Sequence, residues 1–521
     1  MSKMLKASGA MAAATLTSRV LGMVREMVYY HFMGIGWVND AFQYAFTIPN
    51  LFRRLLGEGA LTAAFIPIFK EKEKKHGEVE MWRAANAVIS GLLIAASVII
   101  AVVMIGISIA LDVHQFSESR ELTLRLLRVM FPYMLLVCLT AAMMGMLNAR
   151  GHFFIPAMGA TMLNVVMIAS VFFLAPHMGS ELPQQVFALA IGVLVAGVAQ
   201  AAFQLPTLWR DGFRYHWVSP WKNETVQRVV RQMIPGTIGV AAFQINVALV
   251  QGVGLFAGAG IVSSFNGAVR LMELPQGMFG ISLATFLLPT LSSLATDKNY
   301  PEFRATLRHG LASLIFLNLI ASVLLVVLAE PIVRLLFEHG DKFTAVSTRR
   351  VSFALMCLAP GLAAFSTVNI LARAFYALGD TKTPMKISIV CLTINFTTAC
   401  ILMLPLREGG PGIANTCTSL INVGLLIFAL RKKLKTLEMA ALRATLRPLV
   451  LNTILAGVIA WCGWNYWERN FGHGSIALKL GAVFVPAGVA GGVYWLTALA
   501  CNIPAAKEMT AFALAKFKRL K

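Results

Sequence analysis

Four arginines lie inside apolar stretches that are long enough to cross a lipid bilayer. Arg19 and Arg25 are in the first stretch, Arg53 is in the second and Arg270 is in the eighth. An arginine at the centre of a membrane helix costs roughly 2.5 to 3.5 kcal/mol, so four of them facing lipid would cost on the order of 10 kcal/mol. We therefore expect these side chains to face protein or a water-filled cavity.

Guanidinium groups gathered in such a cavity would bind an anion. Their planar fork of donors suits phosphate better than an ammonium group does, and Arg54 adds a further cation beside Arg53. Too few acids lie on matching helix faces to neutralise all of them, which favours phosphate or pyrophosphate as the ligand. For any single arginine a structural ion pair is the alternative: Arg19 or Arg25 with an acid of another stretch, Arg53 or Arg54 with Glu58, and Arg270 with Glu273.

Prolines and glycines interrupt the same stretches. Pro49 and Pro275 each remove a backbone hydrogen bond, and Gly57 and Gly59 loosen the helix beyond Arg53. Broken helices of this kind are usual at the substrate sites of transporters. The arginines and the helix breaks together predict a transport site for an anion.

The elements that must position these residues are membrane helices. Of the 521 residues, 58% are hydrophobic and 13% are charged, whereas a soluble domain has about 25% charged residues. Apolar segments of about 20 residues, which is the length that crosses a bilayer, recur from end to end. We predict an all-α integral membrane protein with about fourteen spans: 8–33, 38–69, 84–112, 122–147, 154–175, 185–209, 233–256, 258–296, 305–330, 347–377, 385–405, 409–430, 444–466 and 475–500.

The loops between the spans alternate between basic and weakly charged. The basic loops include 70–76, 148–152, 210–232 and 431–435, and the positive-inside rule places them in the cytoplasm. The basic ends of the chain put both termini on the same side. The formal net charge of +21 is therefore a topology signal, and we expect no nucleic-acid partner.

Two sequence matches predict duplicated halves. Segments 148–156 (NARGHFFIP) and 376–384 (YALGDTKTP) share the register of Ala, Gly and Pro, and the step from Asp40 to Pro49 equals the step from Asn266 to Pro275. Chance recurrence of glycine and proline in turns is the alternative for either match alone. We predict an N-terminal lobe of six spans with a cytoplasmic linker at 1–230, a second six-span lobe at 231–432, and a final helix pair with a basic tail at 433–521.

Motifs for metal binding or catalysis do not occur in the sequence. The seven cysteines form no CxxC pair, no two histidines stand four residues apart, and there is no DxD or HExxH motif. We expect no metal, no cofactor and no enzymatic activity. A membrane enzyme acting on polyprenyl-linked sugars is the alternative from another class, and it would ordinarily need a sizeable loop outside the membrane.

Four segments carry a family resemblance. They are SRVLGMVRE (18–26), NDAFQYAFTIPNLFRRLLGEGALTAAFIPIF (39–69), RLMELPQGMFGISLATFLLPTLS (270–292) and FYALGDTKTPMKI (375–387). In this order, and with a likeness over essentially the whole chain, the sequence resembles the MurJ (MviN) lipid II flippase family of the multidrug/oligosaccharidyl-lipid/polysaccharide exporter superfamily.

The resemblance implies two pseudo-symmetric six-helix lobes around a central cavity, and a last helix pair that forms a lipid groove. It implies lipid II as substrate, which is undecaprenyl-pyrophosphate carrying the peptidoglycan disaccharide-pentapeptide, moved from the cytoplasmic to the periplasmic leaflet by alternating access. The expected location is the bacterial inner membrane. Membrane lipids are a second expected partner, and partnership with other cell-wall synthesis proteins is left open.

The resemblance also assigns roles to residues, and these coincide with the arginine cluster. The candidates for substrate binding lie in the apolar stretches that carry the arginines. The candidates for gating or coupling are acids in the same stretches. The substrate-binding set is Arg19, Arg25, Arg53, Arg270, Ser18, Asp40 and Asn50, and the gating or coupling set is Glu26, Glu58 and Glu273.

The sequence departs from the family at a sodium site. Some members use acids of spans 7 and 11, where this chain has Asn246, Gln251 and Asn395. Val269 also stands where some members have Asp, and Glu26 where many have Asp. The departures leave the coupling open between the membrane potential and a monovalent cation. A cation-coupled drug antiporter of the same superfamily is the alternative transporter, although it would favour acids and aromatics over arginines.

Overall fold

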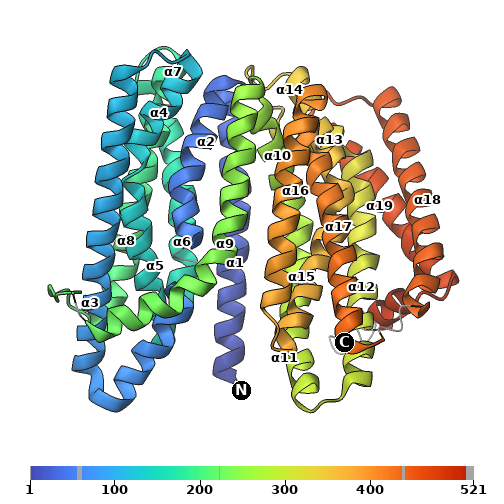
Figure 1. The fold of residues 1–521 in the computed structure, drawn as a ribbon. Helices are drawn as coiled ribbons and strands as arrows, with labels where there is room; N and C mark the ends of the chain where they lie inside the picture. The colour runs from blue at the N-terminus through green and yellow to red at the C-terminus, as the bar shows by residue number, and fades with distance from the viewer. Residues whose placement is uncertain (1, 56–60, 222, 437–439, 512–521) are drawn as a thin grey trace. The chain divides into compact units, whose positions relative to one another are not determined.

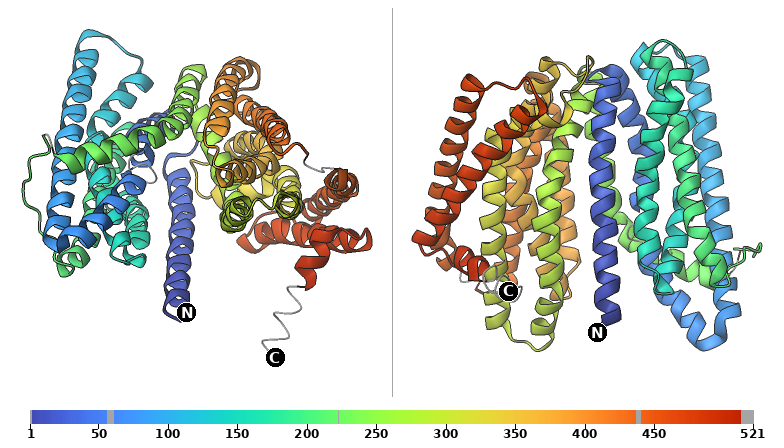
Figure 2. Two further views of the ribbon diagram at one scale, coloured as in Figure 1. Left: turned by 60° about the horizontal axis from the view of Figure 1, so that its bottom comes forward. Right: turned by 180° about the vertical axis from the view of Figure 1, so that it is seen from behind.

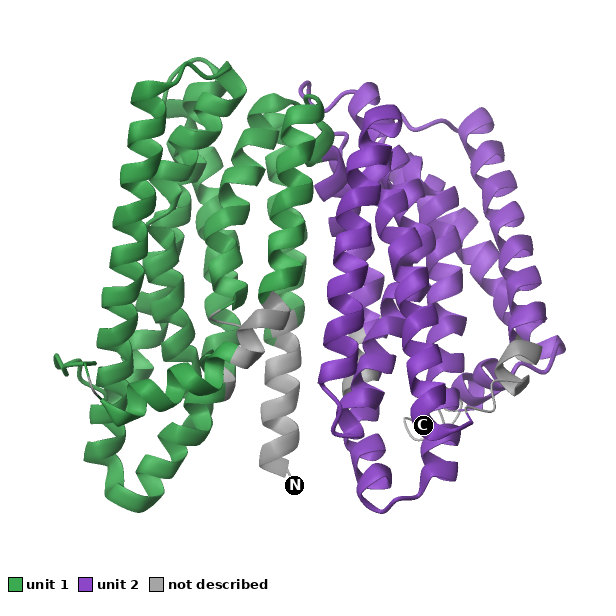
Figure 3. Ribbon diagram, in the orientation of Figure 1, with its two compact units in different colours: residues 1–263 green, residues 264–521 purple. Residues whose placement is uncertain are grey.

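The computed structural model describes residues 2–55, 61–221, 223–436 and 440–511. Over these ranges the chain is helical with connecting turns and loops, and no strand occurs in them. The helices gather into two compact units, Met1–Ser263 and Ser264–Lys521 (Figures 1 and 3). The predicted all-α class is confirmed, and each unit is described by itself below.

The first unit is built from long helices that pack side by side. Two clusters of buried apolar residues hold it together: one surrounds Phe42, Leu126 and Tyr133, and the other surrounds Phe65, Trp82 and Met146. The elements in order are α1 (Ser2–Met33), α2 (Trp37–Phe52), α3 (Leu61–Val113), α4 (Glu118–Met130), α5 (Tyr133–Ala149), α6 (Phe154–Ala169), η2 (Ser170–Leu174), η3 (Ala175–His177), α7 (Leu182–Gln185), α8 (Phe187–Arg210) and α9 (Glu224–Ala257).

The second unit has the same kind of construction. Its apolar clusters surround Leu311 and Phe375 in one case and Phe316 and Tyr494 in the other. Its elements are α10 (Ile261–Pro275), η4 (Gln276–Ile281), α11 (Ser282–Thr296), α12 (Tyr300–Val327), α13 (Ala329–Phe337), α14 (Ala345–Leu358), η5 (Ala359–Gly361), α15 (Leu362–Ala377), α16 (Lys382–Leu406), α17 (Gly409–Leu434), α18 (Ala440–Asn470) and α19 (Ile476–Ala500). The boundary between the units falls within the first turn of α10.

Nine helices of the described ranges are long and apolar enough to cross a membrane, or ten if the bent pair α4 and α5 is counted as one span. The chain is therefore a multi-pass membrane protein. The count treats 64–113 as one helix, although Gly77, at φ 83°, breaks α3 between the predicted second and third spans. The fourteen-span layout and the three predicted domains stay predictions, and by its contacts α9 groups with the first unit.

The matched turns 148–156 and 376–384 have the same backbone structure. The amides of Gly151 and Gly379 bond three residues back, to the carbonyls of Asn148 and Tyr376. The next amides reach five residues back, and both glycines have φ in the left-handed region, at 87° and 73°. This is the Schellman arrangement that ends a helix at glycine. The two matched segments therefore end their helices in the same way.

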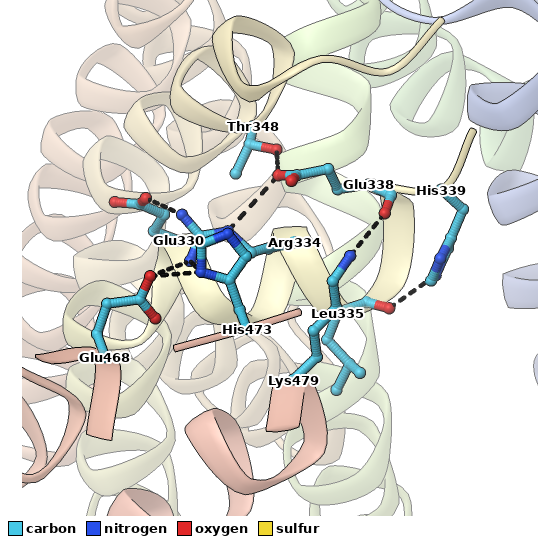
Figure 4. A network of polar contacts seen from close by, with 9 residues as sticks. All are labelled: Glu330, Arg334, Leu335, Glu338, His339, Thr348, Glu468, His473 and Lys479. Carbon is cyan, nitrogen blue, oxygen red and sulfur yellow. Dashed lines mark hydrogen bonds and ion pairs between the residues drawn. The ribbon is translucent and has the colours of Figure 1, made fainter. Parts of the chain in front are cut away.

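The pair α18 and α19 lies side by side at the edge of the second unit (Figure 2). One arginine ties it to α13, because the guanidinium of Arg334 lies 2.6 Å from Glu330 and 3.0 Å from Glu468, which precedes the turn into α19 (Figure 4). His473 in that turn lies 2.6 Å from Glu468, and Lys479 of α19 donates to the carbonyl of Glu338. The helix pair is thus held by charge as well as by apolar packing.

Candidate substrate site

The two arginines of α1 lie in different surroundings. They are six residues apart, which turns the second by about 120° around a helix relative to the first. Arg19 is exposed, whereas Arg25 is buried, with only 8% of its surface accessible. Their different exposure agrees with this separation around the helix.

Arg25 combines burial with incomplete hydrogen bonding. Its Nη2 lies 2.6 Å from the carboxylate of Glu26, which is buried as well. Its guanidinium carbon lies 5.3 Å from the centre of the Tyr29 ring, a distance at which a cation is attracted to the ring face. The Nε atom is buried without a hydrogen-bond partner among the described residues. A buried N–H without an acceptor costs about 1 to 3 kcal/mol, and the oxygen of an anionic ligand would relieve that cost.

Ser18 lies where α1 packs against α6. It is half-buried, and its carbonyl accepts a hydrogen bond of 3.2 Å from Asn164 of α6. Gly22 faces the same amide group, and a Cβ at that position would lie in ordinary contact with it, 3.8 Å away. Sequence reasoning missed Asn164. The signal available was a polar residue within an otherwise apolar predicted span.

Arg53 lies at the end of α2, where the helix widens. Residues 53–55 form a π-helical turn four residues after Pro49, and a second π-helical segment, η4, follows Pro275 directly. Such turns arise where the regular hydrogen-bond ladder is interrupted, and they are frequent at functional sites. Within the turn the Nε of Arg53 donates 2.7 Å to the side chain of Asn50, so that Asn50 orients the guanidinium.

The carboxylate of Asp40 accepts hydrogen bonds from backbone amides. Its side chain is buried, and it accepts hydrogen bonds from the amide of Gly260 and, at 2.7 Å, from the amide of Ser263. Tyr30 of α1 donates 2.8 Å to the carbonyl of Ser263. A carboxylate at the first amides of a helix is stabilised by the helix dipole, so this geometry is that of a cap on α10. The predicted contact of Asp40 with substrate stays a prediction.

The second unit contributes Arg270 and Glu273. The Nη1 of Arg270 lies 2.8 Å from the carboxylate of Glu273, and both side chains are about two-fifths exposed. The ion pair that is the structural alternative for Arg270 is therefore present. For Arg25 the acid partner within the described part of the chain is Glu26, its neighbour in sequence. Glu58, the predicted partner of Arg53 or Arg54, lies outside the described residues.

Neutral polar side chains stand at the positions where some members of the resembled family have acids for sodium. Gln251 of α9 accepts a hydrogen bond of 2.8 Å from Thr47 of α2, and Asn395 of α16 donates 3.1 Å to Asn415 of α17. Each of these pairs joins two helices of the same unit. No group of three or more His, Cys, Asp or Glu residues within the described ranges could hold a metal ion.

Comparison with known proteins places this arrangement in a family. The model of the family described as lipid II flippase MurJ matches residues 29–481. The lipid II flippase MurJ of Burkholderia cenocepacia is 33% identical over 495 residues, covering 92% of this chain and 95% of that protein. The probable lipid II flippase MurJ of Haemophilus influenzae is also 33% identical, covering 80% of this chain and 84% of that protein.

Solved structures agree on the fold. A lipid II flippase MurJ in an inward closed conformation superposes with a TM-score of 0.74 at 21% identity, covering 94% of this chain and 99% of that one. An inward-facing multidrug resistance MATE family transporter of the MOP superfamily superposes with a TM-score of 0.64 at 15% identity, covering 83% and 99%. With relatives matched over most of their length at one-third identity, the chain belongs to the MurJ family of lipid II flippases.

Proposed function

We propose that the protein is a lipid II flippase, which moves the undecaprenyl-pyrophosphate-linked peptidoglycan precursor from the cytoplasmic to the periplasmic leaflet. It does so by alternating access, and no covalent bond is made or broken. Membership of the MurJ family over residues 29–481 carries this proposal. The protein resides in the bacterial inner membrane with both termini in the cytoplasm, the orientation that the basic loops favour.

The pyrophosphate is the group that the arginines bind. Arg25 supports this, because its guanidinium is buried, is held by Glu26 and Tyr29, and retains an unpaired Nε among the described residues. At an effective dielectric constant near 20, an arginine and a phosphate charge about 4 Å apart attract by about 4 kcal/mol before desolvation. Arg19, Arg53 and Arg270 contribute further cations, while Ser18, Asp40 and Asn50 complete the substrate-binding set.

The acids beside the arginines have a second role in this proposal. Glu26 and Glu273 each hold a guanidinium within 2.8 Å, so a phosphate that arrives must compete with them. An exchange of partners between carboxylate and phosphate links substrate binding to the geometry of α1 and α10. Glu26 and Glu273 are accordingly the gating or coupling residues. Glu58, which lies outside the described residues, joins them through the family resemblance alone.

Single substitutions of the arginines test the substrate site. Arg19→Ala, Arg25→Ala, Arg53→Ala and Arg270→Ala should each abolish complementation of a flippase-depleted cell, at a membrane level near that of the wild type. Arg25→Lys should restore function only in part, because lysine keeps the charge and loses the fork of donors. Arg83→Ala is the matched control, since Arg83 is an exposed arginine paired with Glu80 on α3.

The opposite outcome is equally specific. If the arginines serve only as ion pairs, the alanine variants should be poorly inserted, because an uncompensated carboxylate remains. Combining Arg270→Ala with Glu273→Gln should then restore the protein level and the activity together. Full rescue by this double variant, or normal complementation by well-expressed alanine variants, would contradict the proposed site.

A further inference from the structure

The segment that joins α8 to α9 carries three exposed tryptophans. Trp209 ends α8, and Trp217 and Trp221 lie in the loop 211–223. Their accessible fractions are 50%, 61% and 72%. By contrast Trp82, on the adjacent face of α3, is buried at 9%. Large exposed aromatic side chains of this kind indicate a partner that the described chain does not supply.

The loop is held in a defined position against α3. Phe213 packs on Trp82 with ring centres 5.5 Å apart, and Asn86 donates 3.0 Å to the carbonyl of Arg214. One helical turn further, the hydroxyl of Ser90 lies 3.3 Å from that of Tyr215 and 3.4 Å from the amide of Val218. These contacts fix the backbone of the loop, with one side packed against α3. The tryptophans are exposed because they lie on the other side.

These anchor points place the loop beside a membrane span. Trp82, Asn86 and Ser90 recur every four residues along one face of α3, and they extend over about 12 Å of the helix axis. Two of them lie within the predicted span 84–112. The loop therefore runs back along the end of a span, and it projects sideways from the helices of the first unit in two views (Figures 1 and 2). The end of a membrane span is where tryptophan and tyrosine meet the headgroups of the lipids.

The beginning of α9, which follows the loop directly, also exposes apolar side chains. Asn223 caps this helix by accepting from the amides of Thr225 and Val226. Val229 is buried, whereas Val230 and Ile234, four residues apart, are exposed at 43% and 52%. The first turns of α9, residues 224–232, are otherwise mainly polar, and an exposed apolar edge on a polar helical segment is typical of the membrane interface.

The net positive charge of residues 209–234 indicates which lipids this segment would bind. Residues 209–234 contain five basic residues against two acidic ones. Asp211 is paired with His152, and Arg228 is paired with Glu71. Arg210 and Arg231 are exposed, with no carboxylate at ion-pair distance within the described ranges. Two cations beside an apolar and aromatic edge are complementary to an anionic headgroup, whose phosphate they can reach from the interface.

We propose that loop residues 211–221, with Trp209 and the first turns of α9, form an interfacial anchor that binds anionic phospholipid headgroups. The aromatic rings enter the headgroup region, and Arg210 and Arg231 contact the phosphates. This anchor is separate from the substrate site, because it needs only bulk lipid and no translocation. It would hold the linker that follows α8 at the membrane surface.

Tryptophan quenching by brominated lipids tests the anchor in the full-length protein. The protein is reconstituted in phosphatidylcholine vesicles containing a small, equal fraction of either brominated phosphatidylcholine or brominated phosphatidylglycerol. The signal of Trp217 and Trp221 is the difference between wild type and the conservative variant Trp217→Phe/Trp221→Phe. We expect stronger quenching by the brominated phosphatidylglycerol. Trp461→Phe gives the matched control, since Trp461 is exposed at 55% on α18 without a basic neighbour in sequence, and its quenching should not distinguish the two lipids.

Removing the arginines tests the selectivity. In the combined variant Arg210→Gln/Arg231→Gln, the preference for phosphatidylglycerol should fall by up to about fivefold per charge, the factor expected for a basic residue near an anionic surface. Lys432→Gln, which removes an exposed charge from the end of α17, should leave it unchanged. Two results would overturn the proposal: quenching of both tryptophans only by aqueous iodide, or equal quenching by both lipids with no effect of the arginines. Neither depends on whether the protein flips lipid II.

Discussion

At the scale of single residues, the charged side chains of the candidate site differ in what already satisfies them. Arg25 and Arg270 each have a carboxylate beside them, and Arg53 donates to Asn50. Asp40 is satisfied in another way, through backbone amides at the start of α10. In the sequence all four residues give the same signal, which is a charged side chain within an apolar stretch. Only the contacts separate the residues that hold a helix from those that present a donor to a ligand.

The cap made by Asp40 predicts a loss of stability. Hydrogen bonds to a charged group contribute about 1.5 to 3 kcal/mol each, so Asp40→Ala should lower the thermal unfolding midpoint of the detergent-solubilised protein. Asp40→Asn, which keeps one acceptor oxygen, should lie between. Asp112→Ala is the control, because Asp112 is an exposed carboxylate near the end of α3. A wild-type midpoint for Asp40→Ala together with lost complementation would show that Asp40 acts through its proposed substrate contact alone and not as a stabilising cap.

At the scale of elements, the two matched turns also share the way they are fastened. His152, in the first turn, lies 3.0 Å from Asp211, which follows the end of α8. Asp380, at the corresponding position of the second turn, lies 2.8 Å from Lys433 near the end of α17. The turn after the fourth predicted span of each half is thus pinned to the end of the sixth, with the positions of acid and base exchanged. This shared contact is what the predicted duplication of the halves would leave.

The second of these fastenings predicts a dependence on acid. Lys433, followed by Thr383, lowers the pKa of Asp380 from 3.8 to about 2. Because the folded-state pKa is depressed, the stabilisation is fully present above pH 3.8 and is lost as the pH falls through about 2. Lys433→Met should raise the pKa of Asp380 and weaken that part of the acid dependence of the unfolding midpoint. Lys432→Met, at the exposed neighbouring position, should behave as wild type. Identical acid profiles for all three proteins would contradict this account.

At the scale of the whole molecule, the negative charge of the proposed substrate favours the membrane potential as the driving force for translocation. The substrate of the proposed function is anionic and leaves the negative side of the membrane. Each negative charge that moves outward is favoured by a free energy of about 2.3 kcal/mol per 100 mV of membrane potential. Asn246, Gln251 and Asn395 occupy positions where some relatives of the family carry acids for sodium, and Gln251 and Asn395 are used in hydrogen bonds between helices.

This argument predicts the response to ions. Translocation of lipid II in vesicles or cells should persist when sodium is replaced by choline, and it should fail when the membrane potential is collapsed with a potassium ionophore. The comparison requires equal amounts of protein and substrate under each condition. A strict requirement for sodium would exclude the electrical mechanism as the sole driving force and would require a site built from neutral oxygens.

Much of this protein is determined by its sequence. Apolar segments of bilayer length define a multi-pass helical protein, because an unpaired backbone is too costly in lipid for any other structure of this composition. Glycine fixes the turns 148–156 and 376–384 locally, because only a residue without Cβ adopts a positive φ at little cost. The arginines of the candidate site can also be recognised from the sequence. The free-energy cost of an arginine facing lipid follows from its place in an apolar span, whichever helices pack against that span.

The tertiary structure decided what the spacing of residues could not. Asn164 meets Ser18 across 146 positions, and Asp40 meets the start of α10 across more than 220. The ties between Arg334 and the turn before α19, and between the loop 211–223 and α3, also join distant segments. Such contacts depend on which helix faces pack together, which local periodicity leaves open. The partner of each buried polar group is therefore a property of the packed helices.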